Sequence, residues 1–231
     1  MSSRRASARH AIATVARGFG DEAPRVVFVG GTVTALYPLE GGVDVRPTID
    51  VDCVVDVATT AEYYAYVARL RSRGFRECTD EHAPLCRLVY AGIRVDIVAA
   101  RDTGIGPTNR WYGDALACAA SYSVVDVEVL AIAPVYFVAT KLEAFRGRGR
   151  GDYQASHDLE DVLAVIAGLP SLRTQVGGEQ TAVANFVRAE LRQLAKLERF
   201  VDAVPGHFDG DAAGQARATL VLEWRLMLAS A

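Results

Sequence analysis

The chain has 231 residues, of which 51% are hydrophobic and 23% charged, with a formal net charge of −3 at pH 7. This composition allows one large domain or two modest ones around a real core and excludes a disordered chain. The charge gives no global basic field that would demand nucleic acid. No apolar run reaches the roughly 20 residues of a membrane-spanning helix. Because the basic start lacks a signal-peptide core, we expect a cytoplasmic protein with no membrane partner.

The first 133 residues carry both helical and strand patterns. Amphipathic spacing or capping residues predict helices at 5–18, 31–38, 60–73 and 111–120. Alternating or continuous apolar runs predict strands at 25–30, 50–57, 86–90 and 93–99, with one or two more at 124–132. Glycines at 41–42 predict a loop between the first two strands.

After Pro134 the strand patterns disappear and only helical periodicity remains. The predicted helices span 136–145, 156–167, 180–201 and 211–228. We therefore predict an α+β chain with two domains. Residues 1–133 would form a core with a mixed, twisted sheet and flanking helices, and residues 134–231 would form a C-terminal helical domain.

Two short motifs in the front half predict chemistry. The first predicted strand ends in Gly30-Gly31-Thr32, and a glycine turn after a strand offers backbone N–H groups to a phosphate. Asp50 and Asp52 are two residues apart on the next predicted strand, so their side chains share one face. Asp96 lies on the polar face of a later strand. Three clustered carboxylates need a cation, and carboxylate oxygens suit Mg²⁺.

This order of motifs resembles the nucleotidyltransferase signature of the polymerase β superfamily. That signature has Gly-Gly or Gly-Ser, then Asp-x-Asp, then a third Asp on a later strand. The resemblance implies that Gly30, Gly31 and Thr32 bind nucleotide and that Asp50, Asp52 and Asp96 are catalytic and hold metal. Two Mg²⁺ ions, with Mn²⁺ as a substitute, would be the cofactors. The gap between Thr32 and Asp50 is longer than the family's usual spacing.

The helical half is similar to the AbiEii/AbiGii-type toxins, which are nucleotidyltransferases of abortive-infection and toxin–antitoxin systems. The similarity rests on the segments 140–146 and 157–162. It implies that the helical domain contributes to the active-site cleft. Lys141 and Asp158 would be catalytic, Lys141 would contact the triphosphate, and Arg146 would bind nucleotide. Two interpretations stay open for Arg146, Arg148 and Arg150: they bind phosphate, or they form a solvated basic loop. Two interpretations also stay open for Asp161: it belongs to the site, or it forms a structural salt bridge.

The function that this resemblance implies is Mg²⁺-dependent transfer of NMP from an NTP to an acceptor, with release of pyrophosphate. The acceptor would be a tRNA 3′ end or a protein side chain, in a toxin–antitoxin or phage-defence setting. An antitoxin protein or antitoxin kinase is then a possible partner. Two alternatives remain: a small-molecule modifier of the aminoglycoside type, and a binding module that has the fold without the activity.

Overall fold

The computed structural model describes residues 3–43, 46, 48, 50–149 and 151–230, the last six of them by backbone alone. Contacts divide the chain into two compact units, each described below by itself. The first unit comprises Met1–Leu36 with Arg46–Ala133, and the second comprises Tyr37–Val45 with Pro134–Ala231. The segment Tyr37–Val45, which the sequence placed in the first domain, thus groups with the second unit.

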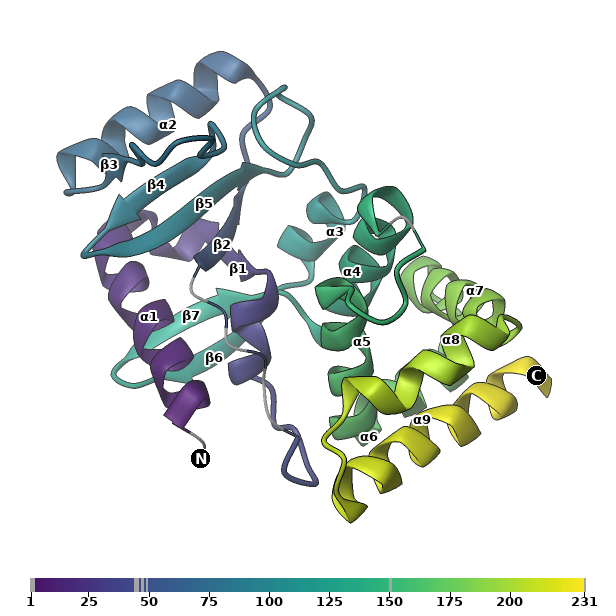
Figure 1. The fold of residues 1–231 in the computed structure, drawn as a ribbon. Helices are drawn as coiled ribbons and strands as arrows, with labels where there is room; N and C mark the ends of the chain where they lie inside the picture. Colours follow the sequence, from purple (N-terminus) through teal and green to yellow (C-terminus); the bar gives the residue numbers. More distant parts are fainter. Residues whose placement is uncertain (1–2, 44–45, 47, 49, 150, 231) are drawn as a thin grey trace. The chain divides into compact units, whose positions relative to one another are not determined.

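Seven strands in the described part of the first unit form a single sheet, in the order β3-β4-β5-β2-β1-β7-β6 (Figure 1). The strands are β1 (Val26–Val29), β2 (Asp50–Val55), β3 (Arg76–Glu77), β4 (Arg87–Tyr90), β5 (Ile93–Ala99), β6 (Ala120–Val124) and β7 (Val127–Ala131). Parallel pairs join β2 to β5 and β1 to β7, and the other pairs are antiparallel. The expectation of a chain with mixed α and β structure is confirmed.

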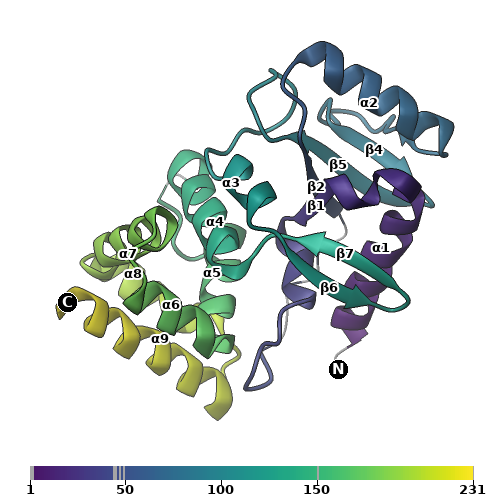
Figure 2. The same cartoon turned by 180° about the vertical axis from the view of Figure 1, so that it is seen from behind.

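The helices of the first unit, apart from η1, bury apolar residues in its core. They are α1 (Ser3–Phe19), η1 (Gly20–Arg25), η2 (Gly31–Ala35), α2 (Thr60–Ser72) and α3 (Tyr112–Ala117). Helix α1 contacts β2, β5, β6 and β7, and Figures 1 and 2 show it beside the sheet from both sides. Its Phe19 ring stacks on Phe75 and meets Phe28 edge-on. Helix α2 begins at the predicted cap, where Thr59 and Glu62 form a capping box.

Two local predictions in the first unit are wrong. The helix expected at 31–38 is a 3₁₀ helix, η2, that ends at Ala35. A short turn of this kind is common as a connector between elements. The segment 120–124, partly assigned to a helix, is strand β6, which forms a hairpin with β7 through Val125 at φ 58°. Exposed polar residues alternate along β6, so its apolar signal is weak.

The second unit contains helices α4 (Pro134–Arg148), α5 (His157–Gly168), α6 (Pro170–Gly178), α7 (Ala182–Ala195), α8 (Glu198–Ala203), η3 (Val204–His207) and α9 (Ala212–Ser230). The long helix predicted at 180–201 is broken between α7 and α8. Helix α6 was not predicted, because Pro170 was taken as a separator, whereas it occupies the first turn of a helix. In the segment Tyr37–Val45, the Glu40 N–H donates to the Gly168 carbonyl at 2.7 Å.

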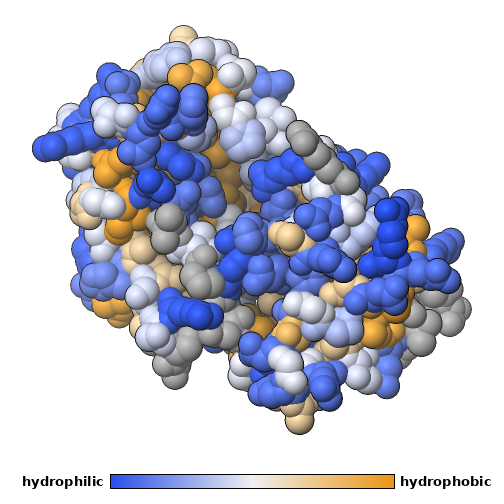
Figure 3. All heavy atoms as spheres, viewed as in Figure 1, coloured by the Kyte–Doolittle hydropathy of each residue, from blue (hydrophilic) through white to orange (hydrophobic). Residues whose placement is uncertain are grey.

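Among the helices of the described residues, none has the length and apolar character needed to cross a membrane. On the face seen in Figure 3, apolar residues are scattered among hydrophilic ones.

Candidate active site

The predicted phosphate-binding turn lies directly after β1. Gly30 has φ 70° and ψ −175°, a backbone conformation that essentially only glycine adopts. The Thr32 hydroxyl, which is buried, donates to the Asp50 carbonyl at 2.6 Å. Thr32 therefore ties the turn to the first residue of β2. The sequence analysis did not predict that contact, which gives the Thr32 hydroxyl a structural role.

Strand register brings the three predicted carboxylates to one region of the sheet. Asp52 on β2 is the direct partner of Asp96 on the parallel strand β5. Side chains of such partners lie on the same face, and Asp50, two residues before Asp52, shares that face. All three side chains are only partly exposed. The structure thus groups Asp50, Asp52 and Asp96, as the sequence predicted; their roles stay predictions.

A guanidinium that the sequence analysis missed occupies this cluster. Arg87 on β4 is the cross-strand partner of Asp96. Its Nε and Nη2 donate to both Asp96 oxygens at 2.8 Å, and Nη2 also donates to Asp50 Oδ2 at 2.9 Å. These bonds to Asp96 raise the pKa of Arg87, so the guanidinium stays charged. One indication of this was present in the sequence: Arg87 and Val89 alternate with the buried Leu88, so Arg87 points to the opposite face of β4 from Leu88.

Gly30 and Asp52 lie in close contact. A Cβ atom added to Gly30 would lie 1.8 Å from Asp52 Oδ2 and 2.6 Å from its Cγ. Only glycine therefore lets the Asp52 carboxylate lie against the turn after β1. The contact joins the predicted phosphate-binding turn to the predicted metal ligand.

Gly30→Ala is expected to destabilise the fold more than Gly92→Ala does. Gly92 also has a positive φ, 80°, but a Cβ there meets nothing within 4 Å. Gly92→Ala thus carries the backbone cost alone, about 1–2 kcal/mol. Gly30→Ala adds a collision with Asp52. Urea unfolding of both variants measures the difference, and equal losses would show that the Gly30–Asp52 contact is not tight.

The carboxylate cluster could hold a divalent cation through one or two of its carboxylates. Asp50 Oδ1 is buried and has no hydrogen-bond partner among the described residues. Such an oxygen is costly to bury unless a ligand completes it. Over the same residues, no group of three or more His, Cys, Asp or Glu side chains is arranged to hold a metal ion. Mg²⁺, however, is commonly held by one or two carboxylates together with water and substrate phosphates.

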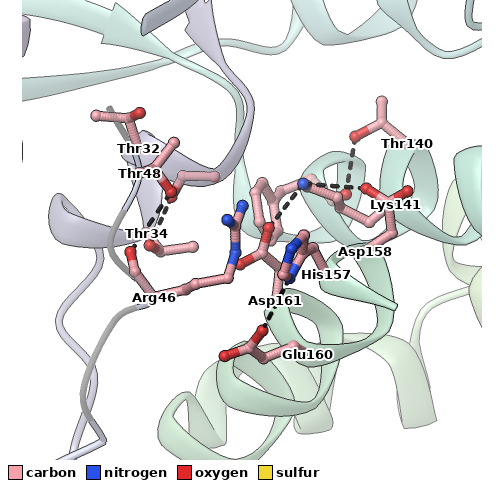
Figure 4. A network of polar contacts seen from close by, with 12 residues as sticks. Thr32, Thr34, Arg46, Thr48, Thr140, Lys141, His157, Asp158, Glu160 and Asp161 are labelled. Carbon is pink, nitrogen blue, oxygen red and sulfur yellow. Dashed lines mark hydrogen bonds and ion pairs between the residues drawn. The ribbon is translucent and has the colours of Figure 1, made fainter. Parts of the chain in front are cut away.

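The second unit contains a separate charged cluster around Lys141 (Figure 4). Lys141 lies on α4 and is only 9% exposed. Its Nζ is 2.6 Å from Asp161 Oδ2 and 3.2 Å from Asp158 Oδ1. Arg148, at the end of the same helix, donates to both oxygens of Asp158 at 2.9 Å. Asp158 and Asp161 share one face of α5, as their spacing predicted.

Helix α5 places Asp158 in its first turn. Ser156 caps the helix by accepting from the Leu159 N–H, and a carboxylate in the first turn is favoured by the helix dipole. Burial alone would raise the pKa of Asp158. Hydrogen bonds from Arg148 and the charge of Lys141 outweigh that effect and hold the pKa below its ordinary value of 3.8.

The lowered pKa of Asp158 predicts a pH-dependent stability. A carboxyl pKa that is lower in the folded state adds to the free energy of unfolding. This contribution is fully present above the unfolded-state pKa of about 3.8 and is lost as the pH falls through the folded-state pKa. Arg148→Met should therefore be less stable at neutral pH and lose less on acidification below 3.8. Urea unfolding across that pH range is the measurement. Arg146→Met, which breaks a different ion pair, is the control; identical pH profiles for the two variants would contradict the assignment.

Arg146 is placed away from Lys141 and its two carboxylates. Its guanidinium pairs with Glu190 at 3.0 Å, beside a cavity of about 240 Å³ that Phe145 and Tyr153 also line. The predicted nucleotide contact by Arg146 thus has no support from its surroundings and stays a prediction. Arg150, the last residue of the predicted basic group, lies outside the described residues.

A larger cavity in the first unit, of about 650 Å³, lies at the other end of the sheet from Gly30. Its lining includes Val27, Val55 and Tyr66. Val55 pairs with Val26 at the start of β1, whereas Asp52 pairs with Val29 at its end. None of the predicted site residues lines this cavity, so it is not the site that the sequence predicted.

No model of a known protein family matches this chain, and a search of curated proteins found no match either.

Proposed function

We propose that the chain is a Mg²⁺-dependent nucleotidyltransferase of the polymerase β superfamily type, similar to the AbiEii/AbiGii-type toxins. The observation that carries the proposal is the grouping of Asp50 and Asp52 on one strand, with Asp52 packed against Gly30 of the turn after β1. Phosphates and metal-binding carboxylates must be adjacent for phosphoryl chemistry, and the turn after β1 beside Asp52 on β2 would bring the two together.

The reaction that we propose joins an acceptor hydroxyl to the α-phosphorus of an NTP. An oxygen–phosphorus bond forms, the bond between the α- and β-phosphates breaks, and pyrophosphate leaves with the electron pair. The hydroxyl's proton passes to a carboxylate of the cluster or to water. A bound Mg²⁺ would be held by Asp50 and Asp52, and it supplies neutralisation of the phosphate charge. The N–H groups of the Gly30–Gly31 turn would orient the phosphates.

Lys141 is the proposed contact for the outer phosphates. Its ammonium is a compact charge of the kind that binds phosphate. Asp158 and Asp161 hold the ammonium in position, and Arg148 adds a second cation to the same cluster.

The acceptor that we propose is a tRNA 3′ end or a protein side chain. The test is to incubate the pure protein with each labelled NTP, Mg²⁺ and bulk tRNA, and in parallel with protein or an aminoglycoside in place of the tRNA. Label on tRNA or protein supports the toxin-like function. Label on the aminoglycoside alone would favour the small-molecule alternative.

Arg87 favours one competing function, a binding module without catalysis. Its guanidinium already neutralises part of the carboxylate cluster, so a metal-free form of the cluster can be stable. This alternative predicts no label transfer to any acceptor, with or without Mg²⁺. The orphaned Asp50 Oδ1 argues against it, since a purely structural ion pair has no need of an unsatisfied buried oxygen.

A further inference from the structure

We infer that the larger cavity of the first unit is a binding site for a small organic anion, one with an apolar body and a phosphate or carboxylate group. The cavity has a volume of about 650 Å³, within the range of roughly 300–1,000 Å³ that is usual for small-molecule sites. The described residues that line it all belong to the first unit, and none of them is predicted to act in nucleotidyl transfer. The inference is therefore independent of the proposed function.

The cavity lies where two parallel strands of the sheet end. Strands β2 and β5 run parallel, and their last residues, Val55 and Ala99, are direct partners. Val55 lines the cavity, as does Ala100, which directly follows β5. Ligands of open sheets commonly bind outside the carboxyl ends of parallel strands, where loops and helices form the walls of a crevice. Here η1, α2 and α3 supply lining residues around the two strand ends.

Much of the lining is apolar. Leu116 on α3 and Leu130 on β7 are partly exposed, so the cavity offers apolar surface that a ligand can cover. Tyr66 on α2 is 4% exposed, and the guanidinium of Arg69 lies over its ring at 5.1 Å from the centroid. Burial raises the pKa of Tyr66, so its phenol adds no negative charge to the cavity. The apolar part of the lining therefore favours a ligand with an apolar body.

Three arginines give the cavity a positive charge. Arg25 ends η1 and Arg101 lies two residues after β5, and both side chains are exposed. Neither forms a hydrogen bond or an ion pair with any described residue. Arg69 is already paired with Glu22 at 2.9 Å, and the other lining carboxylate, that of Asp56, is exposed. Three guanidiniums against two carboxylates leave the lining with one positive charge in excess.

Two uncommitted guanidiniums beside apolar surface favour a ligand that has both characters. A guanidinium donates paired N–H groups to a phosphate or a carboxylate, and it loses little hydration when it does so. An inorganic anion would leave the apolar lining uncovered, and a neutral apolar molecule would leave Arg25 and Arg101 without a partner. Phosphate esters and carboxylates share the required chemistry, and the experiment below distinguishes them.

The experiment uses three probes with the same naphthalene body: naphthyl phosphate, naphthoate and the neutral naphthol. Each is titrated into the whole protein by calorimetry. At least one anion should bind with a stoichiometry of one and about tenfold more tightly than naphthol, because hydrogen bonds to charged groups are worth that much. Its affinity should fall as salt is added, since the two guanidiniums are exposed. The tighter anion identifies the ligand as a phosphate ester or a carboxylate.

The double variant Arg25→Ala with Arg101→Ala should bind the anions no more tightly than naphthol, whereas its affinity for naphthol should stay unchanged. Both side chains are exposed and unpaired among the described residues, so the fold should survive, and thermal melting checks this. Arg76→Ala is the matched control. Arg76 is also exposed and has no such partner, but it does not line the cavity.

Methyl NMR spectra then locate the bound probe. Shifts should gather on the lining residues, above all on Leu116 and Leu130, and not on Leu142 and Leu194 of the smaller cavity in the second unit. Shifts at the smaller cavity, or an anion affinity unchanged in the double variant, would overturn the inference. Equal affinity for naphthol and both anions would do the same, as would no binding of any probe at millimolar concentration. Each of these results would leave the proposed nucleotidyl transfer untouched.

Discussion

Asp52→Asn is expected to abolish nearly all nucleotidyl transfer while the chain stays folded. The change removes the charge of a proposed metal ligand at the place where Asp52 lies against Gly30. A loss of several kcal/mol in transition-state stabilisation corresponds to a rate on the order of 10³-fold lower. Asparagine keeps the shape of the side chain, so the fold and the Gly30 contact survive.

Asp56→Asn is the control for this result. Asp56 follows the same strand four residues later and is exposed, so its charge should not matter for transfer. Rates are compared at saturating Mg²⁺ with thermal melts of both variants. An Asp52→Asn protein that transfers label at the wild-type rate would remove Asp52 from the mechanism.

Asp50→Ala is expected to affect stability as well as activity, because Asp50 is paired with Arg87. Clustered anions alone predict that Asp50→Ala relieves repulsion and leaves the fold as stable or more so. Asp50, however, accepts a hydrogen bond from Arg87 at 2.9 Å. Asp50→Ala should therefore lose metal and activity, and it should also lose some stability through the broken ion pair.

Lys141→Ala is expected to destabilise the chain by about 3–5 kcal/mol, because it removes an ammonium that pairs with two buried carboxylates. The side chain of Asp161 is 3% exposed and that of Asp158 is 9% exposed, and both face the ammonium. A role of Lys141 in phosphate binding alone would predict weaker NTP binding with an intact fold. Because Lys141, Asp158 and Asp161 are all buried, the variant should lose stability, and stability is therefore measured before NTP binding.

Urea unfolding of Lys141→Ala gives the size of this loss, with Lys196→Ala as the control because Lys196 is exposed. The double variant Lys141→Met with Asp161→Asn should recover part of the lost stability, since it removes a charge on each side. A Lys141→Ala protein as stable as the Lys196→Ala protein would contradict the account of the cluster. Binding of NTP is then measured in the double variant, which lacks the ammonium.

Much of the fold was predictable because local signals agreed with one another. The Thr59–Glu62 capping box fixed the start of α2, and the alternation of Ile93, Val95 and Ile97 fixed β5. Strand β6 and helix α6 were missed because their short segments depend on neighbours: β6 on its hairpin with β7, and α6 on Pro170 as a first-turn residue. Tertiary pairing overrides weak propensity in such segments.

The candidate site was predictable residue by residue, but its pairings were not. Asp50, Asp52 and Asp96 could be placed on one face by counting along strands. Arg87 could not be assigned to them, because its contact with Asp96 depends on the register between β4 and β5. Likewise, the i, i+3 spacing of Asp158 and Asp161 was visible in the sequence, whereas their shared contact with Lys141 required the packing of α4 against α5.

The central claim is nucleotidyl transfer, and the most direct test compares two labels on the same NTP. The wild-type protein with Mg²⁺ and its acceptor should incorporate label from the α-phosphate and none from the γ-phosphate, with pyrophosphate as the other product. Asp52→Asn should incorporate neither, and Asp56→Asn should behave as the wild type. Incorporation of the γ-label would indicate a kinase instead, and no incorporation of either label by the wild-type protein, across all four NTPs and every acceptor tested, would contradict the account.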